Sequence, residues 1–120
     1  HKTIPYFFED NDGSDWMSRH FFSGGMMPSA DLPLKFQDSL CFERRWDWSG
    51  VEYQKTSEAW LNKLDAAHND VFNIFSETYG RANAKMWVNR WRVFFMACAE
   101  LFGMHGGDEW RVCHYLFTKR

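Results

Sequence analysis

The side chains of this sequence that could carry chemistry are aromatic rather than charged. Tyr53 stands near the start of a long amphipathic segment, where its phenol could donate or accept a hydrogen bond inside a pocket. Further along, one face of a helical pattern carries Trp87, Trp91, Phe94 and Phe95. Aromatic faces attract cations, so one edge of this face could form a wall around an amine. In both places, core packing is the simpler interpretation.

The sequence gives little support for a phosphate-binding loop, a serine-hydrolase site or a metal site. The pairs Gly24-Gly25 and Gly106-Gly107 lack the Gly-x-Gly spacing and the strand-then-helix context of a phosphate-binding loop. The pattern Gly-x-Ser-x-Gly of a serine hydrolase is absent. We expect no metal site, because metal-ligand spacing is missing among the histidines, which are His1, His20, His68, His105 and His114.

Composition narrows the class of protein further. The chain has 120 residues, 19% of them aromatic, which is enough for one domain with an apolar core. A net charge of -2 does not favour a nucleic-acid partner, and we expect no transmembrane segment because no apolar run approaches the length that spans a bilayer. The three cysteines are scattered and odd in number, which predicts free thiols and a cytoplasmic protein.

Two long helices must position the aromatic side chains. Apolar residues recur at helical spacing over about residues 54 to 76, after the capping-box pattern at 49 to 52 and before Gly80. The second helix is predicted over about residues 82 to 102, and its wide apolar surface predicts cover on more than one face. Two short helices are also predicted, over residues 15 to 22 with Ser14 or Asp15 as cap, and over residues 34 to 40.

Two strands complete the predicted elements. Residues 41 to 48 alternate in type, which predicts a strand with Phe42, Arg44, Trp46 and Trp48 on one face and Glu43, Arg45 and Asp47 on the other. Residues 109 to 118 carry apolar side chains on both faces, which is typical of a strand inside a covered sheet. Since a sheet of two strands is marginal in water, we expect further strands from a missing N-terminal half or from a second chain.

Four segments in order make the sequence recognisable. They resemble the C-terminal part of coclaurine N-methyltransferases, plant enzymes of the cyclopropane-fatty-acid synthase superfamily, and the resemblance covers essentially all 120 residues. The segments are Phe-Phe-Ser-Gly-Gly-Met-Met-Pro-Ser (21 to 29), Tyr-Gln-Lys-Thr-Ser-Glu-Ala-Trp-Leu (53 to 61), Trp-Arg-Val-Phe-Phe-Met-Ala-Cys-Ala-Glu-Leu-Phe-Gly (91 to 103) and Glu-Trp-Arg-Val-Cys-His-Tyr-Leu-Phe (109 to 117).

The resemblance implies an α/β fold, namely the C-terminal part of a class I Rossmann-like methyltransferase with two strands plus substrate-covering helices. Residues 1 to 120 would form the substrate-covering part of a domain whose cofactor-binding half is absent, in keeping with a chain that begins at His1. In that family, the strand matching 109 to 118 runs antiparallel beside the strand matching 41 to 48. S-adenosylmethionine would be bound mainly by residues absent from this chain, and the general base would also lie upstream.

The resemblance also implies roles for single residues. Tyr53 matches a tyrosine in the active site of the cyclopropane synthases, and we expect it to be catalytic. Trp91 and Phe94 match aromatic residues that line the amine pocket of the coclaurine enzymes, and we add Phe95 from the same helix face as a substrate-binding residue. Arg90 stands where those enzymes tend to have a tyrosine, and an arginine does not favour a cationic amine.

The expected function is therefore that of part of an S-adenosylmethionine-dependent methyltransferase that N-methylates a small amine by in-line displacement. This segment would supply a lid and an aromatic wall, and the chain alone is expected to be inactive. Two alternatives stay open at this point. One is a lipid-modifying enzyme of the same superfamily, and the other is a non-catalytic module that uses this fold to dock on a partner.

Overall fold

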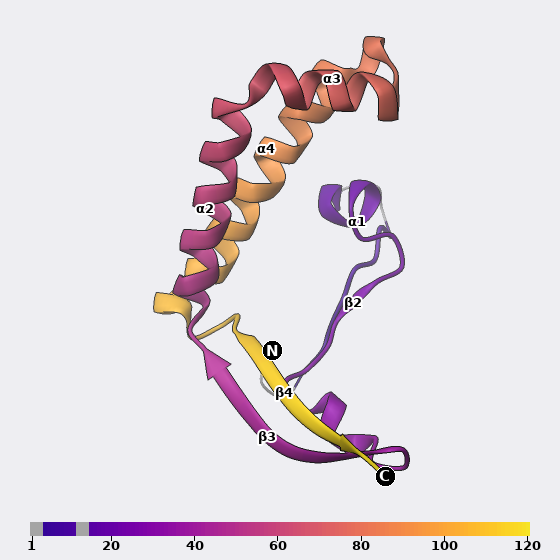
Figure 1. Cartoon of the computed structure of the whole chain (residues 1–120), viewed down its shortest axis with the longest axis vertical. Helices are drawn as coiled ribbons and strands as arrows, with labels where there is room; N and C mark the ends of the chain where they lie inside the picture. The colour runs from indigo at the N-terminus through magenta and orange to yellow at the C-terminus, as the bar shows by residue number, and fades with distance from the viewer. Residues whose placement is uncertain (1–3, 12–14) are drawn as a thin grey trace. The chain divides into compact units, whose positions relative to one another are not determined.

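The structure, a computed structural model of the chain, describes residues 4 to 11 and 15 to 120. It consists of two compact units. The strand unit comprises His1–Trp48 together with Arg111–Arg120, and the helical unit comprises Ser49–Trp110 (Figure 1). Each unit has its own packing.

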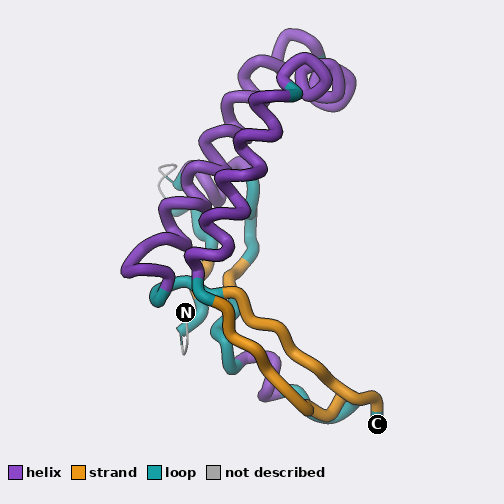
Figure 2. The backbone as a smooth tube through the Cα atoms, turned by 60° about the vertical axis from the view of Figure 1, so that its left-hand side comes forward, coloured by secondary structure: helices purple, strands orange, loops and turns teal. Residues whose placement is uncertain are grey.

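The helical unit holds the three long helices of the chain. They are α2 (Gly50–Ala66), α3 (His68–Tyr79) and α4 (Arg81–Gly103), and the 3-10 turn η2 (Met104–Gly107) follows them. Both α2 and α3 pack against α4, and Figure 2 shows α2 and α4 running side by side. The buried residues of this unit are small or apolar; they include Ser57, Leu64, Ala84, Val88, Cys98, Ala99 and Phe102.

The first long helix that the sequence predicts over residues 54 to 76 is two helices in the structure. It begins earlier, at Gly50, where the Ser49 hydroxyl accepts a hydrogen bond from the Val51 amide at 3.3 Å. It breaks at Ala67, whose φ of -100° and ψ of 26° leave the helical region, and α3 turns away from the line of α2 (Figure 1). The single-helix prediction was wrong because no large apolar residue stands between Leu64 and Val71, so nothing there holds a continuous helix against α4.

The second long helix agrees with its prediction. α4 begins after Gly80, which has a φ of 84° that favours glycine, and α4 ends at Gly103. Within the helical unit, α2 and α3 cover one side of α4, while Met86, Val93 and Met96 are each 42–45% exposed. Cover on a second face of α4 stays a prediction.

No helix among the described residues combines the length and the apolar character that a membrane span requires.

The start of α2 lies unusually close to the turn that follows α4. A Cβ placed on Gly50 would collide with the backbone carbonyl oxygens of Trp110 and Phe102. On the opposite side, Gly107 has a φ of 81°, and a Cβ there would collide with the Ser49 hydroxyl and lie 2.5 Å from the Val51 amide nitrogen. Backbone therefore packs on backbone at this point, which only glycine allows.

The described residues of the strand unit form four strands. The long pair, β3 (Leu40–Trp48) and β4 (Val112–Lys119), is antiparallel and forms the two-stranded ribbon seen in Figure 2. This confirms both predicted strands, although β4 starts at Val112 rather than at residue 109. Within the described residues no further strand pairs with either edge of this sheet. A second small sheet pairs β1 (Tyr6–Phe7) with β2 (Met26–Met27), and strands of two residues are too short to be predicted from sequence pattern.

Short helical elements precede β3. α1 (Trp16–His20) is capped by Asp15, whose carboxylate accepts a hydrogen bond from the Ser18 amide at 3.0 Å; the alternative cap, Ser14, lies outside the described residues. The predicted helix over 34 to 40 was wrong. Only a 3-10 turn, η1 (Leu32–Lys35), forms around Pro33, and the chain then extends into β3.

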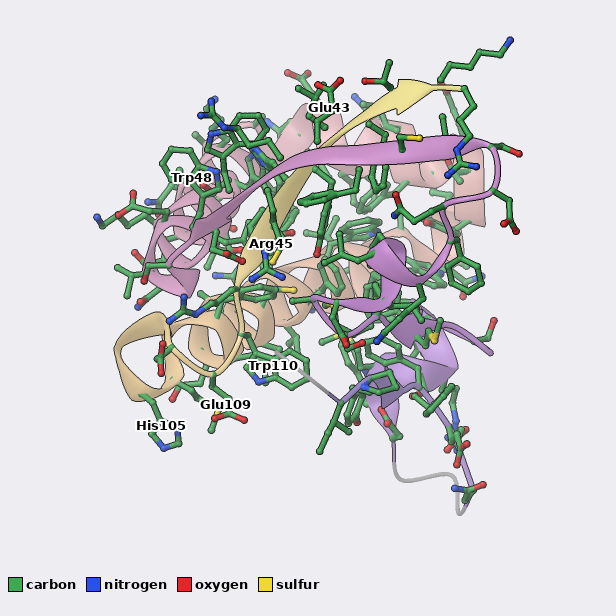
Figure 3. All side chains as sticks on the ribbon, turned by 90° about the horizontal axis from the view of Figure 1, so that it is seen from below. Glu43, Arg45, Trp48, His105, Glu109 and Trp110 are labelled. Atoms are coloured by element: carbon green, nitrogen blue, oxygen red, sulfur yellow. The ribbon has the colours of Figure 1, made fainter. Side chains whose placement is uncertain are left out.

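A β-bulge in β3 changes which side chains share a face. Phe42 pairs with Phe117 and Arg44 with Leu116, so Glu43 is an extra residue on β3. Strict alternation is broken there, and Figure 3 shows Glu43 and Arg45 on opposite sides of the strand. The predicted grouping of the two faces was therefore wrong at Phe42 and Glu43, because the one-residue insertion inverts the alternation before it relative to that after it.

We expect the substitution Gly50→Ala to destabilise the protein by about 3 kcal/mol or more, because its methyl group would meet two backbone carbonyl oxygens that cannot move independently. Urea unfolding followed by tryptophan fluorescence measures this free energy. Gly25→Ala is the control, since a Cβ at that position would lie 3.6 Å from its nearest neighbour and should cost within about 1 kcal/mol. Equal free energies of unfolding for the two variants would contradict the close approach.

Candidate functional site

Aromatic side chains in the helical unit form one continuous series of ring contacts, which we call the aromatic ladder. Neighbouring ring centroids along it lie between 4.1 and 6.4 Å apart, within the range in which aromatic pairs attract each other. The ladder comprises, in order of contact, Phe102, Tyr53, Trp60, Phe95, Phe94, Trp91, Phe75, Tyr79 and Trp87.

Tyr53 lies near one end of the ladder. Its ring meets the edge of Phe102 at 4.5 Å and that of Trp60 at 5.9 Å, both nearly perpendicular. Burial raises the pKa of the Tyr53 phenol above its usual value, and the neighbouring Cys98 adds to this effect. The phenol is therefore protonated at neutral pH, so its O–H is available to donate a hydrogen bond.

Three of the predicted substrate-binding residues form the middle of the ladder. Trp91 contacts Phe94 at 5.4 Å and Phe95 at 5.7 Å, and the two phenylalanine rings contact each other at 5.7 Å. All three come from α4 and are neither fully buried nor fully exposed. The structure thus brings them together as the helical spacing predicts.

Trp60 is the residue that links Tyr53 to this group, and sequence reasoning did not single it out as a site residue. Its ring lies 5.9 Å from that of Phe95 on α4. The signal was present in the spacing, because Trp60 follows Tyr53 by two helical turns and so lies on the same face of α2. Phe75 and Tyr79 of α3 were missed in the same way, and they join the ladder at Trp91 and Trp87.

Arg90, the fourth predicted substrate-binding residue, lies at the far end of the ladder. The carbon of its guanidinium is 4.8 Å from the ring centroid of Trp87. The same indole stacks on Tyr79 at 4.1 Å with an angle of 12° between the rings. A guanidinium over an indole is a favourable cation–π arrangement.

The strand unit carries a separate polar cluster on one face of its sheet. Tyr115 donates a hydrogen bond to the backbone carbonyl oxygen of Ala30 at 2.6 Å, and Arg45 donates to the same oxygen at 3.2 Å. Arg45 also pairs with Asp47 at 3.0 Å, and the Cys113 thiol donates to the other oxygen of Asp47 at 3.1 Å. Burial, together with the hydrogen bond to Cys113, raises the pKa of Tyr115 to about 12. The cluster fixes the segment around Ala30 onto the sheet.

Potential metal ligands do not converge in the described part of the chain, where no group of three or more such side chains is placed to hold an ion. The side chains of His105 and Glu109, in the turn after α4, form an exposed pair 3.4 Å apart (Figure 3).

Comparison with solved structures identifies the fold. The chain matches a crystal structure of coclaurine N-methyltransferase bound to N-methylheliamine and SAH, with a TM-score of 0.83 and 36% sequence identity. The match covers 99% of this chain and 36% of that one. The fold is therefore that of the corresponding part of an α/β methyltransferase, as the resemblance predicted.

Sequence comparison leads to the same relatives. The chain is 37% identical to (S)-coclaurine N-methyltransferase from Thalictrum flavum subsp. glaucum and 37% identical to the enzyme of that name from Papaver somniferum. Pavine N-methyltransferase from Thalictrum flavum subsp. glaucum is 31% identical. All of this chain is matched in each case, and it spans about a third of each relative (34%, 35% and 35%). No protein-family model matches the chain. Over its whole length the chain is thus similar to the C-terminal part of coclaurine N-methyltransferases, which confirms the resemblance.

We expect Cys98 to resist alkylation in the native protein. Burial raises the pKa of this thiol to about 11, so at pH 8 only about one molecule in a thousand carries the reactive thiolate. Cys41 is partly exposed and serves as the internal control. Iodoacetamide labelling at pH 8, followed by peptide mass spectrometry, should modify Cys41 well before Cys98. In urea the two should react alike, and rapid native labelling of Cys98 would contradict its burial.

Proposed function

We propose that the full-length protein containing this chain is an S-adenosylmethionine-dependent methyltransferase that transfers a methyl group to the nitrogen of a small amine. The observation that carries the proposal is the match over 99% of this chain to an enzyme solved with SAH and an N-methylated amine. Sequence identity of 37% over the whole chain to two coclaurine N-methyltransferases supports it. Residues 1 to 120 would supply the part of the domain that covers the substrate.

The aromatic ladder is the part of this chain that suits an amine. Trp91, Phe94 and Phe95 are in mutual contact and only partly exposed, so their rings are fixed by one another. A cation over such a face gains about 0.5–2 kcal/mol per ring. We assign these three residues to the wall that orients the amine and excludes water from its nitrogen.

Tyr53 is the residue that we assign to catalysis. Its phenol is held by edge-on contacts with Phe102 and Trp60, and burial keeps it protonated. A neutral phenol in this setting can donate one hydrogen bond to a group of the substrate. It is a weak base at neutral pH, so removal of the amine proton requires another group.

We infer that the cofactor is bound mainly outside this chain. The ladder offers rings rather than carboxylates, and the described glycines are in turns or close contacts rather than in a Gly-x-Gly loop. S-adenosylmethionine supplies the methyl group in this proposal. The residues of this chain bind and orient the acceptor, and contacts to the cofactor belong mainly to residues outside this chain.

The proposal also includes the location of the protein, its superfamily, a possible neighbouring chain and the class of substrate. Three free cysteines, Cys41, Cys98 and Cys113, support a reducing, cytoplasmic location. Membership of the cyclopropane-fatty-acid synthase superfamily, and a second chain or N-terminal half beside β4, stay predictions. A ladder of contacting rings suits a flat cationic acceptor better than an acyl chain, so a small amine is preferred to a lipid, and to a docking module without catalysis.

In the full-length protein, the substitutions Trp91→Ala and Phe94→Ala should each lower kcat/KM for the amine by about 2-fold to 30-fold, the value of one lost cation–π contact. Methyl transfer from labelled S-adenosylmethionine measures this. Val93→Ala is the control, because Val93 lies on α4 between the two but is 44% exposed. If the control loses as much activity as the two ring variants, the assigned wall is wrong.

Removal of the phenol oxygen of Tyr53 tests its proposed catalytic role. Tyr53→Phe keeps the ring contacts with Phe102 and Trp60, so the thermal midpoint should stay the same while kcat falls about tenfold or more. Phe102→Leu, which disturbs the neighbour of that ring without removing a polar atom, is the comparison variant and should mainly lower stability. An unchanged kcat in Tyr53→Phe would remove the catalytic role.

A further inference from the structure

Arg90 is a partly buried cation without an acidic partner among the residues that the structure describes. Helix α4 carries the cations Arg81, Lys85, Arg90 and Arg92 but a single carboxylate, Glu100. Arg92 is neutralised by Asp65, whose two oxygens accept from its guanidinium at 2.6 and 3.1 Å. Arg90 forms no ion pair with any residue that the structure describes, and its guanidinium lies over the ring of Trp87. Its charge is therefore available to a ligand.

The guanidinium of Arg90 is also held in place. It lies 4.8 Å from the centroid of the Trp87 indole, and that indole is itself stacked on Tyr79 at 4.1 Å. Three groups from two helices, α3 and α4, thus support one another. An arginine stacked on a ring retains the N–H groups at its edge, so stacking orients these donors without using them.

A planar guanidinium beside a ring is suited to a particular kind of anion. Its paired N–H groups match the two oxygens of a carboxylate, which can accept two parallel hydrogen bonds. The rings of Tyr79 and Trp87 offer apolar surface to the body of the molecule that carries the acid. A free inorganic ion would gain nothing from these rings, whereas a flat organic acid would.

The position of Arg90 connects this group to the proposed amine wall. Residues 87, 90, 91 and 94 are three or four positions apart on α4 and so share one face of the helix. Arg90 and Phe94 are neighbours on that face, as are Trp87 and Trp91. A molecule whose amine lies against Trp91 and Phe94 would therefore have Arg90 within about one helical turn.

We propose that Arg90 binds a carboxylate group of the substrate, so that the acceptor is an alkylamine that carries both an aromatic ring and an acid. This inference rests on the proposed N-methyltransferase function and names its substrate class. It resolves the conflict of charge noted for this residue, because a guanidinium repels a bare ammonium group but attracts a molecule whose carboxylate faces it. Arg90 is in this role a specificity-determining residue.

A matched pair of secondary amines, each with an aromatic ring, tests the proposal by binding alone. The probes are 1,2,3,4-tetrahydroisoquinoline and 1,2,3,4-tetrahydroisoquinoline-3-carboxylate, which differ only by the acid. Titration calorimetry on the full-length protein measures both dissociation constants. The carboxylate probe should bind about tenfold tighter than the plain amine, the usual value of a charged hydrogen-bonded contact.

Variants of Arg90 test whether its guanidinium causes the tighter binding of the carboxylate probe. Arg90→Gln should abolish it, and Arg90→Lys should retain only part of it, since an ammonium group lacks the planar pair of donors. Lys85→Gln is the matched control, because it removes an exposed cation from the same helix and should leave the preference unchanged. Far-UV circular dichroism and the thermal midpoint verify that each variant is folded.

The outcomes separate this inference from the proposed function. Equal binding of the two probes by the unmodified protein, or a preference that survives in Arg90→Gln, overturns the carboxylate site. So does a loss of stability in Arg90→Gln with the preference intact, which would make Arg90 a cover for Trp87. A preference that depends on Arg90, without methyl transfer to either probe, supports the site and contradicts the proposed reaction. Methyl transfer to both probes with equal kcat/KM supports the reaction and contradicts the site.

Discussion

The contact between α2 and α4 is the constraint on which the rest of the helical unit depends. At its base, Gly50 lies against the carbonyl oxygens of Phe102 and Trp110, a distance that no side chain permits. Once the backbones are this close, the rings of α2 must interleave with those of α4 as the helices continue. Tyr53 meets Phe102 within the first turn, and Trp60 meets Phe95 two turns later. The ladder is therefore a result of helix packing as well as a candidate surface for a ligand.

Because the same rings pack the helices and could bind a ligand, the sequence alone does not distinguish packing residues from binding residues. Helical spacing alone predicted that Trp91, Phe94 and Phe95 share a face, and the structure agrees. The spacing could not tell which rings of α2 and α3 complete that face, because contacts between helices depend on where each helix starts and bends. Trp60 and Tyr79 were missed for this reason. Arg90 was noticed for its charge, but its contact with Trp87 required coordinates.

Elements with strong local signals were predictable, and those set by tertiary contacts were not. Ser49, Gly80 and Gly103 mark helix ends in the sequence, and the structure has helix ends at or beside each of them. The break at Ala67 has no glycine or proline to mark it, and it arises from a gap in the apolar pattern. The bulge at Glu43 likewise has no glycine or proline to mark it in the sequence. It depends on the register between two strands that are far apart in the chain.

The break between α2 and α3 has a consequence for how this protein could diversify. A straight helix would extend about 18 Å beyond residue 67, since each of the 12 residues of α3 adds about 1.5 Å, and it would leave Tyr79 far from Trp87. The break lets α3 pack against α4. Helix α3 can therefore vary independently of α2. Changes in the length or sequence of α3 would alter the surroundings of Arg90 and leave those of Tyr53 intact. In the proposed enzyme, substrate selectivity could then change while the surroundings of the proposed catalytic residue stay the same.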